Sequence, residues 1–196
     1  MSIRGFTLGN LRLDNPLVLA PLSGVTNLPF RLLAKRHGAA LVVTEMISGA
    51  GLCQGSVKTV RLMDSEPEER PLVVQLFGAR PGWLARAAEL VQEAGADVID
   101  INMGCPVRKV VRHGAGAALL KDFNLIKDIL TQVRRVVTIP LTVKTRIGWK
   151  PGVGEIDDLA PILADCGVDG VTLHGRWAIQ KYSGKADWSK IARLVE

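Results

Sequence analysis

Residues 97–106 read Asp-Val-Ile-Asp-Ile-Asn-Met-Gly-Cys-Pro, and this stretch carries most of the information about the fold. Residues 97–101 form a short apolar run with β-branched side chains, which is typical of a buried strand. The run ends in an amide, a thiol and two turn-forming residues, namely Asn102, Cys105, Gly104 and Pro106. Ligands of α/β folds bind at the carboxyl ends of strands. The stretch therefore predicts a strand that ends at a functional site, and the alternative is an inert cysteine beside a turn.

The same unit repeats along the chain: an apolar strand, polar or turn residues, and an amphipathic helix that stops at glycine. The predicted strands are 17–20, 41–44, 72–77, 97–101, 139–144 and 170–174, and the clearest helices are 80–94, 124–136 and 155–166. Residues 94–101 resemble residues 166–173, which indicates a repeated strand–helix unit. Residues 3–13 alternate around Gly9-Asn10 and predict a hairpin of the kind that plugs a barrel bottom.

Polar or reactive residues accompany nearly every predicted strand. In strand order they are Pro21 and Ser23, Glu45, Gln75, Asn102 and Cys105, Lys144 and Arg146, and His174 and Arg176. A doubly wound sheet gathers its chemistry at one switch point, whereas a barrel collects it from many strand ends. We therefore predict an α/β fold of the (β/α)₈ TIM-barrel class with an N-terminal β-hairpin.

The predicted barrel is incomplete. A complete barrel takes about 250 residues, and this chain has 196. The helix predicted at 187–196 carries no stop signal. We therefore expect residues 1–196 to be one catalytic domain that stops after about six strand–helix units, with strands seven and eight outside it.

The composition is that of an ordinary globular protein, with 47% hydrophobic and 22% charged residues. No apolar run approaches the roughly 20 residues of a membrane span, and the first residues do not resemble a signal peptide. The three cysteines and three histidines lack the spacing of a disulfide framework or a metal site. We expect a cytoplasmic, reduced protein that binds neither a membrane nor a metal.

The formal net charge is +6, and many cations fall in the loops after the predicted strands. These loop cations are Arg108, Lys109, Arg112, Arg146, Lys150, Arg176, Lys181 and Lys185. Positive charge gathered at one barrel mouth attracts RNA phosphates. The alternative is a dispersed, solvated surface, because the predicted helices also carry arginine and lysine.

Several motifs together resemble the tRNA-dihydrouridine synthases, a family of FMN-dependent (β/α)₈ enzymes, and most closely their bacterial B-type branch. The motifs lie at 19–31, 73–78, 100–110, 114–120, 143–149, 173–176 and 182–187. The Asn-Met-Gly-Cys-Pro segment with its basic loop is the most specific. The chain departs from the usual Pro-Met-Ala at Leu22 and Ser23, and from the usual Thr-Asp-Arg-Pro at Asn27 and Leu28.

The resemblance implies a reaction in which FMN, reduced by NADPH, gives a hydride to C6 of a uracil in tRNA while a proton reaches C5. Cys105 is the implied proton donor, because a thiol on a turn at the mouth can project toward the base. The resemblance also implies that the flavin-phosphate loops and a C-terminal helical tRNA-binding domain lie outside this chain.

The remaining implied roles concern the flavin and the base. The flavin contacts are Pro21, Leu22 and Ser23 on the ring face, Gln75 at the pyrimidine edge, Lys144 beside the anionic N1 and O2 region, and His174. The substrate contacts are Asn102, Arg176 and Tyr182. The structural alternatives are a Lys144 that extends to solvent, a Gln75 bonded to nearby backbone and a structural His174. Cys53 and Cys166 are interpreted as structural.

Two other functions remain open at this stage. The first is an FMN barrel of the dihydroorotate dehydrogenase or old yellow enzyme kind, which acts on a small molecule. The second is an inactive fragment of the synthase, since unpaired edges of an open barrel favour association. Flavin content and activity on free pyrimidines would separate these alternatives.

Overall fold

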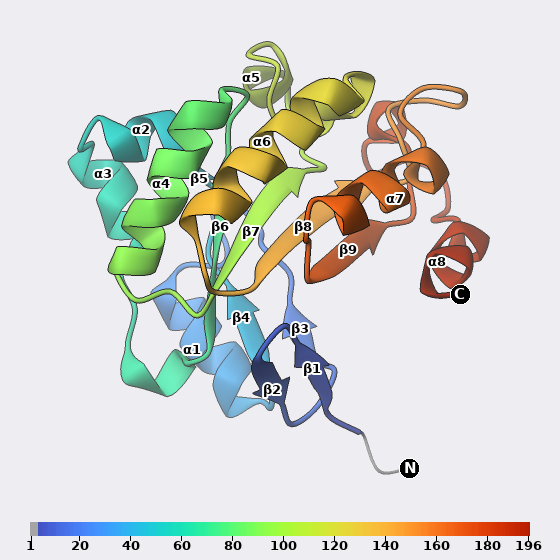
Figure 1. Cartoon of the computed structure of the whole chain (residues 1–196). Coiled ribbons are helices and arrows are strands. Elements are labelled where there is room, and N and C mark those ends of the chain that lie inside the picture. The colour runs from blue at the N-terminus through green and yellow to red at the C-terminus, as the bar shows by residue number, and fades with distance from the viewer. Residues whose placement is uncertain (1–3) are drawn as a thin grey trace.

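The computed structural model describes residues 4–196 as a curled parallel sheet with helices on its outer side and a separate hairpin below (Figure 1). The six strands that pair in order are β3 (Val18–Leu19), β4 (Leu41–Val43), β6 (Leu72–Phe77), β7 (Val98–Met103), β8 (Leu141–Arg146) and β9 (Gly170–His174). A short strand, β5 (Ile47–Ser48), also pairs with β6. The prediction of a barrel-class α/β fold with an N-terminal hairpin is confirmed, as a curled half-barrel.

Helices connect the strands along the convex side. They are α1 (Leu28–Arg36), α2 (Gly49–Cys53), α3 (Val57–Val60), α4 (Pro81–Glu93), α5 (Arg108–Val111), α6 (Phe123–Val136), α7 (Ile156–Asp165) and α8 (Trp188–Val195). The helix expected at 187–196 is α8, and Asp187 caps it by accepting from Ser189 N and Lys190 N. Within residues 4–196, no helix has both the length and the apolarity required to cross a bilayer.

Four of the six predicted strands differ from the observed ones in their bounds, and two of these differences change where a candidate site residue lies in its strand. The strand predicted at 97–101 continues to Met103 in β7, so Asn102 lies within the strand rather than after it. The strand predicted at 139–144 begins later, at Leu141, because Pro140 lacks the N–H that a ladder position uses. Lys144 therefore lies inside β8 and not at its end. The change in the strand's bounds does not alter the alternation of its side chains, so Lys144 lies on the concave face.

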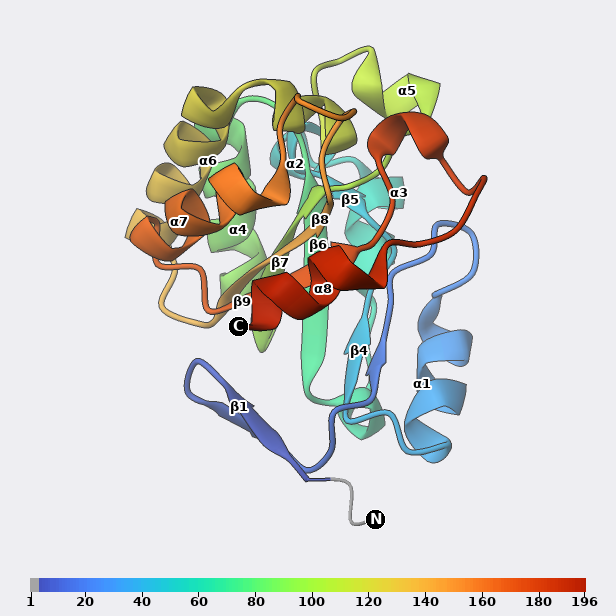
Figure 2. The ribbon, with the colours of Figure 1, turned by 90° about the vertical axis from the view of Figure 1, so that its right-hand side faces the viewer.

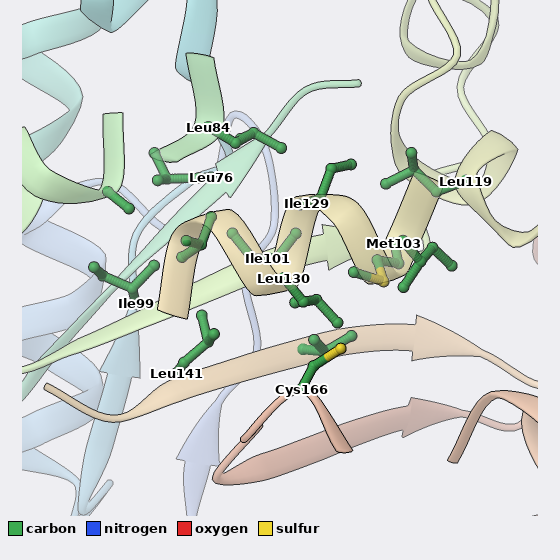
Figure 3. Close-up of a cluster of buried hydrophobic side chains, with 14 of the residues drawn as sticks. Leu76, Leu84, Ile99, Ile101, Met103, Leu119, Ile129, Leu130, Leu141 and Cys166 are labelled. Atoms are coloured by element: carbon green, nitrogen blue, oxygen red, sulfur yellow. The ribbon is translucent and has the colours of Figure 1, made fainter. Parts of the chain in front are cut away.

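The main core lies between the sheet and the helices (Figure 3). In β7, Ile99, Ile101 and Met103 point outward to this layer and are fully buried. The apolar stripes of α4 and α6 cover them, with Leu84, Ile129 and Leu130 among the residues at no measurable exposure. The other side chains of each strand consequently face the concave side.

The hairpin of β1 (Phe6–Leu8) and β2 (Leu11–Leu13) lies at the amino ends of the parallel strands, at the bottom of both views (Figures 1 and 2). Its Leu8 and Leu13 form a second apolar cluster with residues of the concave face, Leu41, Val43, Val73 and Val98. The expected role of the hairpin as a bottom plug is thus confirmed for its described residues. Ile3, the first residue of the predicted hairpin segment, lies outside them.

The two similar sequence segments adopt equivalent structures. Asp97 precedes β7 and accepts a hydrogen bond from Leu72 N at 2.7 Å, while Arg70 pairs with the same carboxylate. Asp169 precedes β9 and accepts from Leu141 N at 2.8 Å, with Arg134 in the equivalent role. Each aspartate thus satisfies the N–H that begins the neighbouring strand, so the position has the same structural role in both segments.

Candidate active site

A cavity of about 360 Å³ opens at the carboxyl ends of the strands. Its lining includes the candidates Pro21, Leu22, Ser23, Gln75, Asn102, Cys105, Lys144, His174 and Tyr182. These residues come from the carboxyl-terminal halves of β6, β7, β8 and β9 and from the loops that follow β3, β7 and β9. Arg176 is the one candidate that does not line the cavity. The parallel strands thus bring residues far apart in sequence to one mouth, as expected for a barrel.

The turn that carries Cys105 is held on both sides by hydrogen bonds to its backbone. Asn102 Oδ1 accepts from Gly104 N at 3.2 Å and from Cys105 N at 3.0 Å. Ala117 N donates to Cys105 O at 3.0 Å. Gly116 passes so close that a Cβ there would lie 2.7 Å from Cys105 O, and its φ is +60°, so only glycine fits. Cys105 is therefore a half-buried thiol on a fixed turn.

A row of polar side chains crosses the concave face just below the mouth. Gln75, Asp100 and Thr142 lie opposite one another in register across β6, β7 and β8. Asp100 accepts from Gln75 Nε2 and from Thr142 Oγ1, each at 2.7 Å. Gln75 Oε1 in turn accepts from Asn102 Nδ2 at 2.9 Å. The alternative that Gln75 bonds to nearby backbone through its amide is wrong, because both ends of that amide meet side chains.

Asp100 and Lys144 form the charged centre of the concave face. Burial raises the pKa of Asp100 to about 6, although hydrogen bonds from Thr142 and Gln75 and the charge of Lys144 oppose the rise. Burial lowers the pKa of Lys144, and the carboxylate of Asp100 partly restores it. Lys144 also lines a second cavity of about 240 Å³ deeper in the half-barrel. Its ammonium therefore lies between two cavities rather than in bulk solvent.

His174 is the last residue of β9 and is neutral at physiological pH. Its pKa falls to about 4, first because of burial and then because of Arg146, Lys144 and Arg176. Arg176 Nη1 lies 3.2 Å from His174 Nε2. A guanidinium can only donate, so Nε2 accepts and the ring proton stays on Nδ1. His174 thus presents an N–H donor through Nδ1.

Arg176 itself turns away from the cavity. Its Nη2 donates to Gly184 O at 3.0 Å, and within residues 4–196 its buried Nε has no hydrogen-bond partner. The tight turn at Gly175 directs it, because Arg176 N bonds back to His174 O at 2.7 Å. The direct contact of Arg176 with substrate stays a prediction, and the observed partners of its guanidinium are His174 and Gly184.

Arg146 is a cavity residue whose expected role was different. The sequence places it among the mouth cations that attract RNA, but it is only 2% exposed. Its guanidinium donates to three carbonyls, those of Gly104, Trp177 and Lys181. It also lies 5.7 Å from the ring centroid of Tyr182, in cation–π range. Arg146 therefore connects the Cys105 turn to the loop after β9.

Other cavity residues gave no sequence signal of function. Met46, Val25 and Val107 add apolar surface to the mouth. Glu45, one of the polar residues expected at the strand ends, does not line the cavity; it accepts a hydrogen bond from Gly24 N and so holds the 21–26 loop against the cavity. The alternation of strand and loop predicted the loops, but apolar side chains in loops have no distinctive spacing. Only their contacts in the fold identify them.

The remaining loop cations are dispersed over the exposed surface of the mouth. Those classed as exposed are Arg108, Lys109, Arg112, Lys150, Lys181 and Lys185. Among the described residues, no group of three or more histidine, cysteine, aspartate or glutamate side chains is arranged to hold a metal. The mouth therefore combines an apolar and hydrogen-bonding cavity with a basic rim.

Two solved structures share the fold of this chain. The structure of 2-naphthoyl-CoA reductase with 2-naphthoyl-CoA matches with a TM-score of 0.64 at 12% identity, over 89% of this chain and 40% of that chain. Histamine dehydrogenase from Rhizobium sp. 4-9 matches with a TM-score of 0.60 at 12% identity, over 88% of this chain and 36% of that one. At this identity, the likeness concerns the fold alone.

Comparison by sequence is more specific. A probable tRNA-dihydrouridine synthase of Rickettsia prowazekii is 42% identical over 96% of this chain and 58% of its own length. The tRNA-dihydrouridine synthase B of Xanthomonas axonopodis pv. citri is 43% identical over 91% of this chain and 54% of its own length. This chain thus spans little more than half of these relatives. The family model described as dihydrouridine synthase (Dus) matches residues 18–196, and the chain belongs to that family.

Proposed function

We propose that this chain forms the flavin- and uridine-binding part of an enzyme that reduces uridine to 5,6-dihydrouridine in tRNA. The observation that carries the proposal is the convergence of Cys105, Lys144, Gln75 and His174 on one cavity in a member of the dihydrouridine synthase family. The proposed cofactor is FMN, and the proposed reductant is NADPH. The names of the relatives support a tRNA substrate.

The cavity residues fit an isoalloxazine ring. The apolar surface of Pro21, Leu22 and Met46 suits a flat aromatic face, and Gln75 and the Nδ1–H of His174 offer polar contacts. Lys144 is a half-buried cation whose desolvation is only partly offset by Asp100. A ligand anion beside it would complete the compensation, which suits the anionic N1 and O2 region of a reduced flavin.

Bound in this cavity, reduced FMN would supply the hydride for C6 of the uracil. The chain's own contribution at C5 is the proton of the Cys105 thiol, which leaves a thiolate on the fixed turn. Asn102 orients the turn through its two backbone contacts and so holds the thiol in place.

The exposed cations of the rim would bind the phosphates near the target uridine. Such contacts weaken steeply as the salt concentration rises, because binding releases condensed counterions. A uridine within folded RNA must also leave its stack to reach a cavity of this kind. The basic loop after Cys105, with Arg108 and Lys109, is suited to hold the backbone of the extruded nucleotide.

The small-molecule alternative receives less support, because the two sequence relatives described above are named as tRNA enzymes. Reduction of free uridine or of a free pyrimidine base, without RNA, would favour that alternative. The inactive-fragment alternative concerns this chain alone and is separated from the others by flavin binding.

The test begins with the visible absorption spectrum of the purified chain before and after FMN is added. We expect a bound-flavin spectrum that is lost in Lys144→Met. NADPH oxidation is then measured with unmodified tRNA transcripts, and dihydrouridine is detected in the product. Cys105→Ala should keep the flavin spectrum and lose RNA reduction, whereas Cys53→Ala, a change at another half-buried cysteine, should keep both. A flavin-loaded chain that reduces free uridine but not uridine in tRNA would refute the proposal.

A further inference from the structure

The hydrogen-bonded side chains beneath the cavity form a series with a defined direction. Asp100 accepts from the amide nitrogen of Gln75, and Gln75 accepts from the amide nitrogen of Asn102. Asn102 in turn accepts from the N–H groups of Gly104 and Cys105. All three side chains are buried, with exposures of 4% for Asp100, 1% for Gln75 and 8% for Asn102. Every link thus passes from a nitrogen donor to an oxygen acceptor.

This direction is required at both ends of the series. Asp100 offers acceptor oxygens, so Gln75 must face it with its NH₂ group. The Cys105 turn presents the N–H groups of Gly104 and Cys105 to Asn102, so Asn102 must face them with its oxygen. The two amides between these ends satisfy both conditions only when each points its nitrogen toward Asp100. If either amide rotated by half a turn, two donors or two acceptors would face each other in a buried place.

We propose that Asp100 is a positioning residue for the Cys105 turn, because its carboxylate sets the orientation of Gln75 and, through it, of Asn102. A core residue with no such role would not need an acceptor there, and this one receives Gln75 Nε2 at 2.7 Å although burial penalises its carboxylate, as the raised pKa shows. Asp100 does not line the Cys105 cavity, so it acts through other side chains. The value of this positioning for proton donation rests on the proposed function.

The series depends on the acceptor that faces Gln75, and not on the negative charge itself. A protonated Asp100, or an asparagine, still has one carbonyl oxygen for Gln75 Nε2. Its O–H or N–H can then donate to Thr142 Oγ1, because a hydroxyl is both donor and acceptor. Asparagine at position 100 should therefore preserve the direction, and leucine, with a similar size and no acceptor, should abolish it.

The experiment measures amide hydrogen exchange at single residues by NMR in the chain without flavin or RNA. In Asp100→Leu, we expect the amides of Gly104 and Cys105 to exchange about five- to tenfold faster, the factor that loss of about one hydrogen bond produces. Ile99 and Ile101, whose amides belong to the strand ladder, should exchange at the wild-type rate. Asp100→Asn should restore slow exchange at Gly104 and Cys105.

Two further variants keep the test decisive. Thr142→Val removes a bond to Asp100 but leaves the oxygen that faces Gln75, so exchange at the turn should not change. Gln75→Met removes the intermediate amide and should accelerate the same two amides, even if Asp100→Leu does not fold. Wild-type exchange at Gly104 and Cys105 in Gln75→Met, or equal effects of leucine and asparagine at position 100, would overturn the proposal.

Steady-state kinetics provide a second, separate measurement. In flavin-loaded protein, Asp100→Leu should lower kcat about as much as it loosens the turn, with KM for tRNA unchanged, and Asp100→Asn should recover kcat. The exchange measurement uses neither cofactor nor RNA. Absence of tRNA reduction by the wild-type chain would therefore count against the proposed function. Unchanged amide exchange at Gly104 and Cys105 in the variants would count against the positioning role.

Discussion

The replacement of Arg146 by methionine tests how the Cys105 turn and the loop after β9 are held together. Methionine keeps most of the buried alkyl stem but removes the donors to Gly104 O at 2.8 Å, Trp177 O at 3.1 Å and Lys181 O at 2.7 Å. Hydrogen bonds from a charged donor each contribute about 1.5–3 kcal/mol. Water from the adjacent cavity can donate to some of the three carbonyls that lose their partner. We therefore expect a total loss of about 3 kcal/mol in the free energy of unfolding.

The loss should be concentrated in one segment. Lys181 has a φ of +52°, an unfavourable conformation for a residue with a side chain, and its carbonyl is one of the three acceptors. Without Arg146, this residue is expected to relax and release Tyr182 from its cation–π contact. Amide exchange should therefore rise across residues 176–185 more than in β7 or β8.

The assay combines urea unfolding with residue-level amide exchange, on the wild type, Arg146→Met and Arg146→Lys. Lysine keeps the charge but lacks the planar fork that reaches three carbonyls, so its loss should be intermediate. A loss below about 0.5 kcal/mol, the usual range of an unimportant surface change, would refute the reasoning. Equal losses for lysine and methionine would show that the charge contributes nothing beyond geometry.

Three further predictions concern the half-buried imidazole of His174, the buried carboxylate of Asp100 and the buried ion pair of Arg31 and Glu69. His174 has a folded-state pKa of about 4, so the unfolded state binds the proton at a higher pH than the folded state. The free energy of unfolding should therefore fall as the pH drops from about 6.5 to about 4. In His174→Gln, the urea midpoint should fall less over the same interval. Asp100 has a raised pKa of about 6, so its burial costs stability as pH rises from about 4 to about 6. Asp100→Asn should gain relative to wild type across that interval, by about 3 kcal/mol at most, and a pH-independent difference would contradict this. Arg31 and Glu69 form a buried ion pair at 2.6 Å, with exposures of 2% and 0%. Arg31→Met should cost about 3–5 kcal/mol in urea unfolding, much of it recovered when Glu69→Gln is added, and a cost without recovery would count against an unpaired charge as its cause.

The strand–helix repeat and its polar strand ends were predictable because they depend on local periodicity. Apolar runs such as 72–77 and the stripe of 124–136 have the spacing of a strand and of a helix, and the structure places β6 and α6 there. The short elements β5, α2 and α3 were not predicted. Segments of five residues or fewer contain too few residues to establish a period, and they form through contacts with the rest of the fold.

The candidate residues were predictable as a group, and their contacts were not. Parallel strands place their carboxyl ends on one side, so Asn102, Lys144 and His174 had to share a mouth once the barrel class was identified. The burial of Arg146 and the rotation of Arg176 toward His174 depend on the path of the loop after β9. No sequence period encodes that path.

The sequence by itself therefore determined the class of fold, the face on which the reactive side chains lie and the family to which the chain is similar. Only the tertiary structure decided which polar group meets which. The direction of the series from Asp100 to Cys105 depends on the register of β6 against β7, which pairs Gln75 with Asp100. Such pairing depends on the positions of atoms from distant segments, and it exists only after the sheet has formed.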